Sequence, residues 1–167
     1  CSGDAGVYGM AGLILELAQQ YPGVRVRIVP GITAACAGAA VLGAPLMHDF
    51  AVISLSDRLT PLEDIWNRVE AAAQADFVIC LYNPASKGRP DFFRQACSRI
   101  LKYRAEDTVC GLAVNIGREG EEMEVLTLEE LKDRRVDMFT TVYIGNSHTR
   151  QIGPYMVTPR GYRYEGN

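Results

Sequence analysis

A run of five apolar residues at positions 77–81 (FVICL) limits the fold of this chain more than any other feature. A strand that is apolar on both faces is typical of a parallel sheet covered by helices on both sides. Hydrophobic patterning predicts three further strands and two amphipathic helices. We expect the strands at residues 50–55, 108–114 and 139–144, and the helices at residues 61–74 and 90–103. This alternation predicts an α/β fold in which the four strands share one sheet.

Residues 1–50 differ in composition from the rest of the chain and predict a second structural region. They hold half of the glycines but few of the charged side chains, namely Asp4, Glu16, Arg25, Arg27 and Asp49. Helical spacing predicts a helix at residues 8–20, and alternating Val/Ile and Arg predicts a strand at residues 24–29. Small residues at 33–42 predict a tightly packed helix. The shift in composition places a boundary near Asp49.

Shorter elements complete the pattern in the second half of the chain. Residues 60–63 (TPLE) predict a capped helix start, with Thr60 as the N-cap and Glu63 closing a capping box. A strand at residues 124–127 followed by a short helix at 128–131 is also expected. The closing stretch, residues 155–164, is predicted to add one antiparallel edge strand.

The charge balance limits the partners of this protein. A formal net charge of -3 and a pI near 5.4 argue against wholesale binding to nucleic acid or to an anionic membrane. Residues 28–47 carry no charge and imitate a membrane span. Because they consist mainly of Ala and Gly and contain Pro30 and Pro45, a helix packed inside a soluble protein is the better interpretation.

The cysteines and histidines indicate a reduced compartment and no metal site. The five cysteines are widely scattered and contain no CxxC pair, so we expect free thiols in a cytoplasmic protein. His48 and His148 have no ligands at metal-site spacing, so no metal centre is predicted. Either histidine could act as a general base, but a merely solvated side chain is the more common case.

The glycine-rich start suits a small-molecule site. Gly3, Gly6, Gly9 and Gly12 recur every three residues around Asp4, which matches neither the dinucleotide fingerprint nor a Walker loop. Glycine lets a ligand approach the backbone, and Asp4 supplies an acceptor. Glycines that merely allow close helix packing are the alternative.

Polar turns follow several predicted strands and form the candidate binding edge. Residues 30–35 (PGITAA) combine a tight turn with Thr33, which we expect to be an N-cap. Asn83 precedes Pro84, which favours an extended backbone and an amide that points into the crevice beyond the sheet. The turns at residues 115–118 (NIGR) and 145–147 (GNS) are expected at the same edge, where open α/β sheets bind ligands. Ordinary turns remain the alternative for each of them.

Several segments taken together resemble the cobalamin-pathway tetrapyrrole methylases. They span nearly the whole chain, and the long second segment is highly specific. They are SGDAGVYGMAG (2–12), VPGITAACAGAAVLGAPLMHDFAVISLSD (29–57), LYNPASKGR (81–89), NIGREGE (115–121), VDMFTTVYIGNSHT (136–149) and TPRGY (158–162).

The resemblance implies a protein of two α/β lobes with mostly parallel sheets that binds S-adenosylmethionine between the lobes. It implies methylation of C-17 of a tetrapyrrole while the macrocycle contracts by one carbon, by a cytoplasmic homodimer. Any cobalt would be carried by the substrate. Matching the motifs one by one implies ten cofactor-binding residues: Ser2, Gly3, Asp4, Val7, Thr33, Ala34, Asn83, Asn115, Ile116 and Thr140.

One departure from the family pattern concerns the start of the chain. Family members begin with a strand and a GxGPG loop, which this sequence lacks, so we expect a fragment with an incomplete first lobe. Residues 1–47 would be the end of that lobe and residues 48–167 the second lobe. Two kinds of alternative remain open. The chain could belong to a sister methylase or a diphthine-forming relative, or it could be a non-catalytic tetrapyrrole- or cofactor-binding module.

Overall fold

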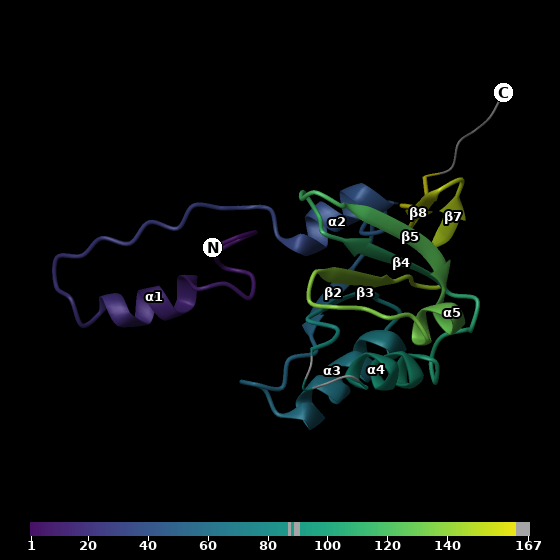
Figure 1. The fold of residues 1–167 in the computed structure, drawn as a ribbon, viewed down its shortest axis with the longest axis horizontal. Coiled ribbons are helices and arrows are strands. Elements are labelled where there is room, and N and C mark those ends of the chain that lie inside the picture. The colour runs from purple at the N-terminus through teal and green to yellow at the C-terminus, as the bar shows by residue number, and fades with distance from the viewer. Residues whose placement is uncertain (87, 89–90, 163–167) are drawn as a thin grey trace.

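The computed structural model describes residues 1–86, 88 and 91–162. Residues 1–33 form an arm that extends away from a body built around a five-stranded sheet (Figure 1). The strand order in that sheet is β2-β3-β6-β4-β5. Its strands are β2 (Phe50–Ser54), β3 (Val78–Tyr82), β4 (Val109–Val114), β5 (Glu122–Thr127) and β6 (Thr140–Ile144).

The predicted core strand lies in the interior of this sheet. β3 pairs with β2 on one side and with β6 on the other, and its residues 78–81 are fully buried. The sheet separates two apolar clusters. α3 (Leu62–Gln74), α4 (Phe92–Ile100) and α5 (Leu128–Lys132) cover one face, and α2 (Ala34–Leu42) covers the other (Figure 1). The α/β fold and the shared sheet are therefore confirmed.

The expectation of a mostly parallel sheet is wrong. Within the five-stranded sheet, only β2 and β3 pair in parallel, and β6 runs antiparallel to both β3 and β4. The cause is the connection after β4. A turn at residues 115–121 reverses the chain into β5, and α5 then carries it across β4, so that β6 keeps the direction of β5.

The amphipathic helices bury the faces that their spacing predicts. α3 buries Ile65, Trp66 and Val69, while α4 buries Phe93 and Cys97. The capping prediction for α3 is wrong, because Pro61 occupies the N-cap position and no side chain caps the helix. A capping box does occur at α5, whose short helix and preceding strand agree with the prediction. There the Glu130 amide donates to Thr127 Oγ1, and the Thr127 amide donates to Glu130 Oε2.

A second, three-stranded sheet is not hydrogen-bonded to the large one within the described residues. Its order is β1-β8-β7, formed by β1 (Gly43–Ala44), β7 (Arg150–Ile152) and β8 (Tyr155–Val157). β8 pairs antiparallel with β7 but parallel with β1, so the predicted closing strand lies in this small sheet rather than at the edge of the large one. Residues 163 and 164 of that prediction, and the predicted helix start at residue 90, lie outside the described residues.

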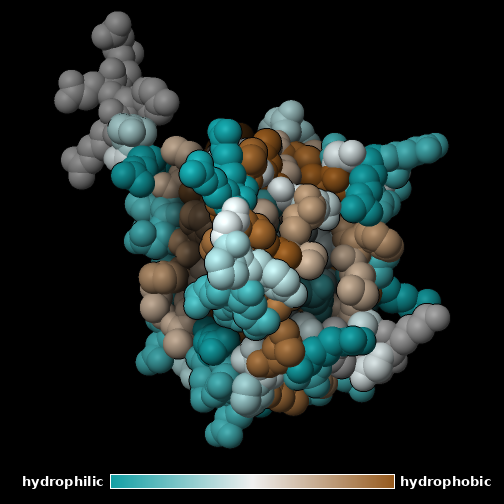
Figure 2. Space-filling model, turned by 90° about the vertical axis from the view of Figure 1, so that its left-hand side faces the viewer, coloured by the Kyte–Doolittle hydropathy of each residue, from teal (hydrophilic) through white to brown (hydrophobic). Residues whose placement is uncertain are grey.

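The arm holds one short helix and an extended segment. α1 (Ala11–Ala18) is shorter than the predicted helix, and the strand predicted at residues 24–29 is not formed. A strand needs a hydrogen-bonded neighbour, and no described strand lies beside this segment. The arm consequently exposes large apolar side chains, including Leu13, Val29 and Ile32. Figure 2 shows this side of the molecule, where apolar and polar residues are interspersed at the surface.

Two sequence-based interpretations concern the small-residue segment and the cysteines. No described helix is both long and apolar enough to span a membrane, and α2 has nine residues. All five cysteines are free in the structure, and Cys80, Cys97 and Cys110 are buried. Burial raises the pKa of the Cys97 thiol to about 12 and also raises the pKa values of the Cys80 and Cys110 thiols.

Candidate functional site

One edge of the large sheet collects the turns that the sequence singled out. β2, β3 and β4 run in the same direction and end there, and the antiparallel β6 begins there. Val114 lies opposite Thr140 in the β4–β6 pair, and Leu81 lies opposite Val142 in the β3–β6 pair. This register brings Asn83, Asn115 and Thr140 to the same edge, where ligands of open α/β sheets bind.

The direction of β6 corrects one prediction about this edge. The turn at residues 145–147 follows β6, and β6 is antiparallel to its neighbours, so this turn lies at the opposite edge of the sheet. Ser147 there donates from its hydroxyl to Asp76 Oδ2, at 2.6 Å. His148 follows in the same turn and is not brought to the candidate site. Its backbone amide donates to Asn146 Oδ1.

The glycine-rich start of the arm is fastened to the turn before α2. The Asp4 carboxylate accepts hydrogen bonds from the Gly6 and Gly31 amides, each at 2.8 Å. Gly3 has a φ of 71°, a conformation that glycine adopts without strain. A Cβ on Gly31 would come within 3.0 Å of the Gly3 carbonyl oxygen. Glycine is therefore required at position 31 by the close approach of the two backbones, and it is favoured at position 3 by the left-handed conformation.

The Asp4 carboxylate is expected to hold this loop only in its charged form. Hydrogen bonds from the Gly31 and Gly6 amides lower the pKa of Asp4 below its usual value of 3.8. The stabilisation is therefore present above the ordinary pKa and is lost as the pH falls through the lowered one. We expect Asp4→Asn to speed amide hydrogen exchange at Gly6 and Gly31 at neutral pH.

Glu16→Gln is the control for this exchange measurement, because it also removes one exposed carboxylate from the arm. It should leave the exchange of both amides unchanged. Unaltered exchange in Asp4→Asn would show that the carboxylate does not fasten the loop.

Thr33 occupies the N-cap position of α2, as predicted, but its side chain does not cap the helix. Its backbone is extended, with φ -66° and ψ 152°, and α2 begins at Ala34. The Ala35 amide, which an N-cap side chain would satisfy, donates instead to the Tyr82 hydroxyl at 2.6 Å. Thr33 Oγ1 lies 2.6 Å from the same phenolic oxygen. Tyr82, from the end of β3, thus takes the place of the side-chain cap.

A second tyrosine, Tyr143 in β6, holds the start of α2 from the sheet. The Tyr143 hydroxyl lies 2.8 Å from the carbonyl oxygen of Ala34 and 2.9 Å from that of Ala35, and it donates to them. Tyr143 is fully buried in β6, and burial raises the pKa of its phenol, so the group stays neutral. A Cβ on Gly38 would come within 3.0 Å of this hydroxyl and of Ile116 Cδ1. The small residue at position 38 lets α2 pack onto the sheet.

Both asparagines of the candidate edge adopt a left-handed backbone. Asn83 has a φ of 52° and Asn115 a φ of 51°, a region that asparagine tolerates better than most residues. The extended conformation expected for Asn83 is therefore wrong. Its Nδ2 donates to Ser54 Oγ at 3.0 Å, which links the ends of β3 and β2. Asn115 Nδ2 donates to the Gly120 carbonyl oxygen and closes the turn after β4.

Tyr8 is a residue of this edge that the sequence analysis did not select. It has a φ of 51°, and its ring centroid lies 5.6 Å from that of Tyr82. Its hydroxyl donates to the Val52 carbonyl oxygen at 3.2 Å and accepts from the Ser54 amide at 3.3 Å. The available signal was its place inside the glycine-rich segment. Tyr8 joins the arm to the end of β2.

The remaining predicted residues lie at or near the same edge with different surroundings. Ser2 and Val7 are exposed on either side of Asp4 in the arm. Ile116 packs against the apolar cluster beneath α2. Thr140 is buried, and its hydroxyl donates to Asp137 Oδ1 at 3.0 Å. Its side chain therefore helps to shape the segment before β6.

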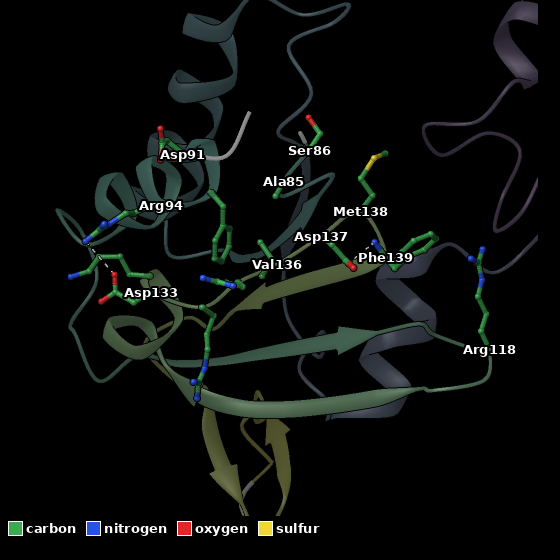
Figure 3. A pocket seen from close by; sticks show the side chains of 14 residues that line it. Ala85, Ser86, Asp91, Arg94, Arg118, Asp133, Val136, Asp137, Met138 and Phe139 are labelled. Atoms are coloured by element: carbon green, nitrogen blue, oxygen red, sulfur yellow. Dashed lines mark hydrogen bonds and ion pairs between the residues drawn. The ribbon is translucent and has the colours of Figure 1, made fainter. Parts of the chain in front are cut away.

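A pocket of about 1020 Å³ borders this edge on the α4 side of the sheet (Figure 3). The segment after Asn83 and the segment before Thr140 both contribute to its lining. Arg94 pairs with Asp133 at one end at 3.3 Å, and at the other end the Arg118 guanidinium lies 5.5 Å from the Phe139 ring centroid. An arginine beside an aromatic ring, as Arg118 is, suits a flat ligand that carries carboxylates.

Comparison with known proteins decides which family this geometry belongs to. A family described as tetrapyrrole (corrin/porphyrin) methylases matches residues 1–132.

The chain belongs to the tetrapyrrole methylase family.

Individual relatives of this methylase agree with that assignment. This methylase is 49% identical over 162 residues to a probable cobalt-factor III C(17)-methyltransferase of Salmonella typhimurium. The match covers 96% of the chain and 67% of that protein. A protein of the same description from Methanocaldococcus jannaschii is 44% identical over 169 residues, covering 96% of the chain and 68% of the relative. The methylase thus spans about two thirds of the length of these relatives.

Solved structures support the fold. The crystal structure of the methyltransferase CobJ matches with a TM-score of 0.86 and 38% identity, over 94% of this chain and 67% of that one. A uroporphyrin-III C-methyl transferase from Thermus thermophilus, solved with S-adenyl homocysteine, matches with a TM-score of 0.65 at 21% identity, over 86% and 62%. The latter likeness establishes a shared fold.

Proposed function

We propose that this methylase transfers a methyl group from S-adenosylmethionine to C-17 of precorrin-3B, or of its cobalt form, with ring contraction in cobalamin biosynthesis. The observation that carries the proposal is the 49% identity over 162 residues to the probable cobalt-factor III C(17)-methyltransferase of Salmonella typhimurium. The carboxyl edge of the sheet supports it, because three segments far apart in sequence meet there: the arm loop, the start of α2 and the turn after β3.

The groups at this edge fit an amphipathic cofactor such as S-adenosylmethionine. The cofactor supplies an electrophilic methyl group on a sulfonium. Gly3 and Gly31 leave backbone accessible, and Asp4 keeps their two segments together. Thr33 offers a hydroxyl that is not used for capping, and Asn83 and Asn115 shape the turns after β3 and β4 with a left-handed backbone. Ser2, Val7, Ala34, Ile116 and Thr140 complete the proposed set.

The arginine-bordered pocket fits the substrate side of the same proposal. A tetrapyrrole carries several carboxylates around a flat macrocycle, and Arg118 beside Phe139 can pair a carboxylate while the ring contacts the macrocycle. Methyl transfer is an in-line displacement that depends on alignment. Holding the two reactants in register can supply roughly 7–11 kcal/mol of the barrier. An electron-rich carbon of the macrocycle can act as the nucleophile, so the proposal requires no strong general base.

The experiment is a single-turnover assay of the complete protein with S-adenosylmethionine and precorrin-3B or its cobalt form. We expect one methyl group at C-17 and a macrocycle shortened by one ring carbon, both measured by mass spectrometry and NMR. Methylation of another ring carbon would favour a sister methylase. Binding of cofactor and tetrapyrrole without turnover would favour a binding module. The homodimer, the cytoplasmic location and the lobe boundary near residue 47 stay predictions.

A further inference from the structure

We propose that Tyr82 is a positioning residue that turns the Thr33 hydroxyl into a hydrogen-bond donor for the cofactor. The inference rests on the proposed function, because it concerns the same edge of the sheet. It adds a role for a residue outside the motif-derived set. It also assigns the direction of the hydrogen bond that the site offers to an oxygen or nitrogen acceptor of the ligand.

The directions follow from the partners of one phenolic oxygen. Tyr82 Oη accepts the Ala35 N–H at 2.6 Å, which leaves its own proton to be donated. Thr33 Oγ1, at 2.6 Å, is the other group bonded to Tyr82 Oη within the described part of the chain, and the distance allows either oxygen to donate. The inference assigns the donor role to Tyr82, which directs the proton of the Thr33 hydroxyl to a different acceptor.

No described protein group takes that proton. The Thr33 side chain makes no cap bond, and it is half-buried at the rim of the edge rather than enclosed in the core. Burial raises the pKa of Tyr82, so the phenol keeps its proton at neutral pH. A hydroxyl whose lone pair is already engaged by a donor is a better donor itself, since chained hydrogen bonds polarise one another.

Neighbouring contacts hold Tyr82 in the orientation that this chain of bonds needs. The Tyr8 ring lies against it, and Asn83, the next residue, is anchored to Ser54 at the end of β2. Tyr82 itself closes β3, and its amide and carbonyl are fixed by pairing with β2 and by the Leu55 amide. The phenol is thus placed by the sheet and reaches the start of α2 from below.

The test is calorimetric binding of S-adenosylhomocysteine to the complete protein and to Tyr82→Phe, Thr33→Val and the double variant. We expect Tyr82→Phe and Thr33→Val each to weaken binding by about 3- to 10-fold, the range for one neutral hydrogen bond. The double variant should bind about as weakly as Thr33→Val alone, because Tyr82 influences the cofactor through the Thr33 hydroxyl. Thr33→Ser keeps the hydroxyl and should restore most of the affinity.

Tyr103→Phe is the matched control, since it also removes a phenol hydroxyl. Tyr103 follows α4, and its hydroxyl donates to Glu70 of α3. Tyr103→Phe should bind S-adenosylhomocysteine as the wild type does. All titrations are run well below the melting temperature of each variant.

Wild-type affinity in Tyr82→Phe, or additive losses in the double variant, would overturn the inference. If the wild type binds S-adenosylhomocysteine but fails to methylate the tetrapyrrole, the proposed function falls while the inference stands. If the wild type does not bind it at all, both are overturned.

Discussion

Gly31→Ala is expected to lower kcat/KM for methyl transfer on the order of 100-fold, the scale of a 1 Å misplacement in an active site. A Cβ at position 31 would lie under 3.0 Å from the Gly3 carbonyl oxygen, which is backbone and cannot rotate away. The two segments must separate, and the Asp4–Gly31 hydrogen bond lengthens with them. Because residue 31 is exposed, the loop can shift without unfolding the body. Activity should therefore fall far more than the melting temperature.

The control for this variant is Gly12→Ala, the same substitution in α1 of the same arm. A Cβ on Gly12 meets nothing within 4 Å, and alanine favours a helix over glycine by about 0.5–1 kcal/mol. Steady-state kinetics of the complete protein and calorimetric cofactor titration measure both variants. Gly12→Ala should keep wild-type kinetics. Wild-type kinetics in Gly31→Ala would mean that the close approach of the two backbones is unimportant for the reaction.

Asp76→Ala is expected to lower the free energy of unfolding by about 2–4 kcal/mol. Arg104 is almost fully buried and forms an ion pair with the Asp76 carboxylate, while its Nη2 donates to the Phe77 carbonyl oxygen at 2.9 Å. Removing the carboxylate leaves that buried charge without its anionic partner. The amide and hydroxyl of Ser147 also lose their acceptor, at 3.0 and 2.6 Å. The side chain of Asp76 is 42% exposed, which keeps the loss below that of a fully buried pair.

Asp76→Asn distinguishes the effect of losing the charge from the effect of the left-handed backbone at position 76. Asp76 has a φ of 61°, which asparagine tolerates but alanine does not, so Asp76→Asn should lose about 1–2 kcal/mol. Asp107→Ala removes an exposed carboxylate close to Arg104 in sequence and should stay within about 0.5 kcal/mol of the wild type. Urea unfolding curves at pH 7 measure all three. Equal stability of Asp76→Ala and Asp107→Ala would contradict the role of the ion pair.

The Asp76 carboxylate also predicts how the free energy of unfolding changes at acid pH. Burial pushes the pKa of Asp76 upward, but the hydrogen bonds from Ser147 and the Arg104 charge hold it below its usual value of 3.8. A lowered folded-state pKa contributes stability above the ordinary pKa, and that contribution is lost as the pH falls through the lowered value. Unfolding measured below about pH 4 should therefore depend less on pH in Asp76→Asn than in the wild type.

Local patterns in the sequence predicted the elements that depend on residues close together in the chain. The apolar run at 77–81 predicted an interior strand, and amphipathic spacing predicted the helices α3 and α4. The Pro-Gly turn predicted that α2 starts after Thr33. Polar turns after β3 and β4 predicted one edge of the sheet, which the register confirms. The cofactor-binding role of the ten motif-derived residues stays a prediction.

Features that depend on partners distant in sequence were decided only by the tertiary structure. Hydrophobic periodicity does not encode strand direction, so the antiparallel β6 and the place of the turn after it required the sheet itself. Residues 24–29 have a strand pattern but no described neighbour to pair with. A threonine before a helix predicts its own side-chain cap, yet here Tyr82, 49 residues away, takes that position. Residue identity and spacing therefore fixed the elements and their buried faces, whereas hydrogen-bond partners were chosen by which groups the packed sheet brought within reach.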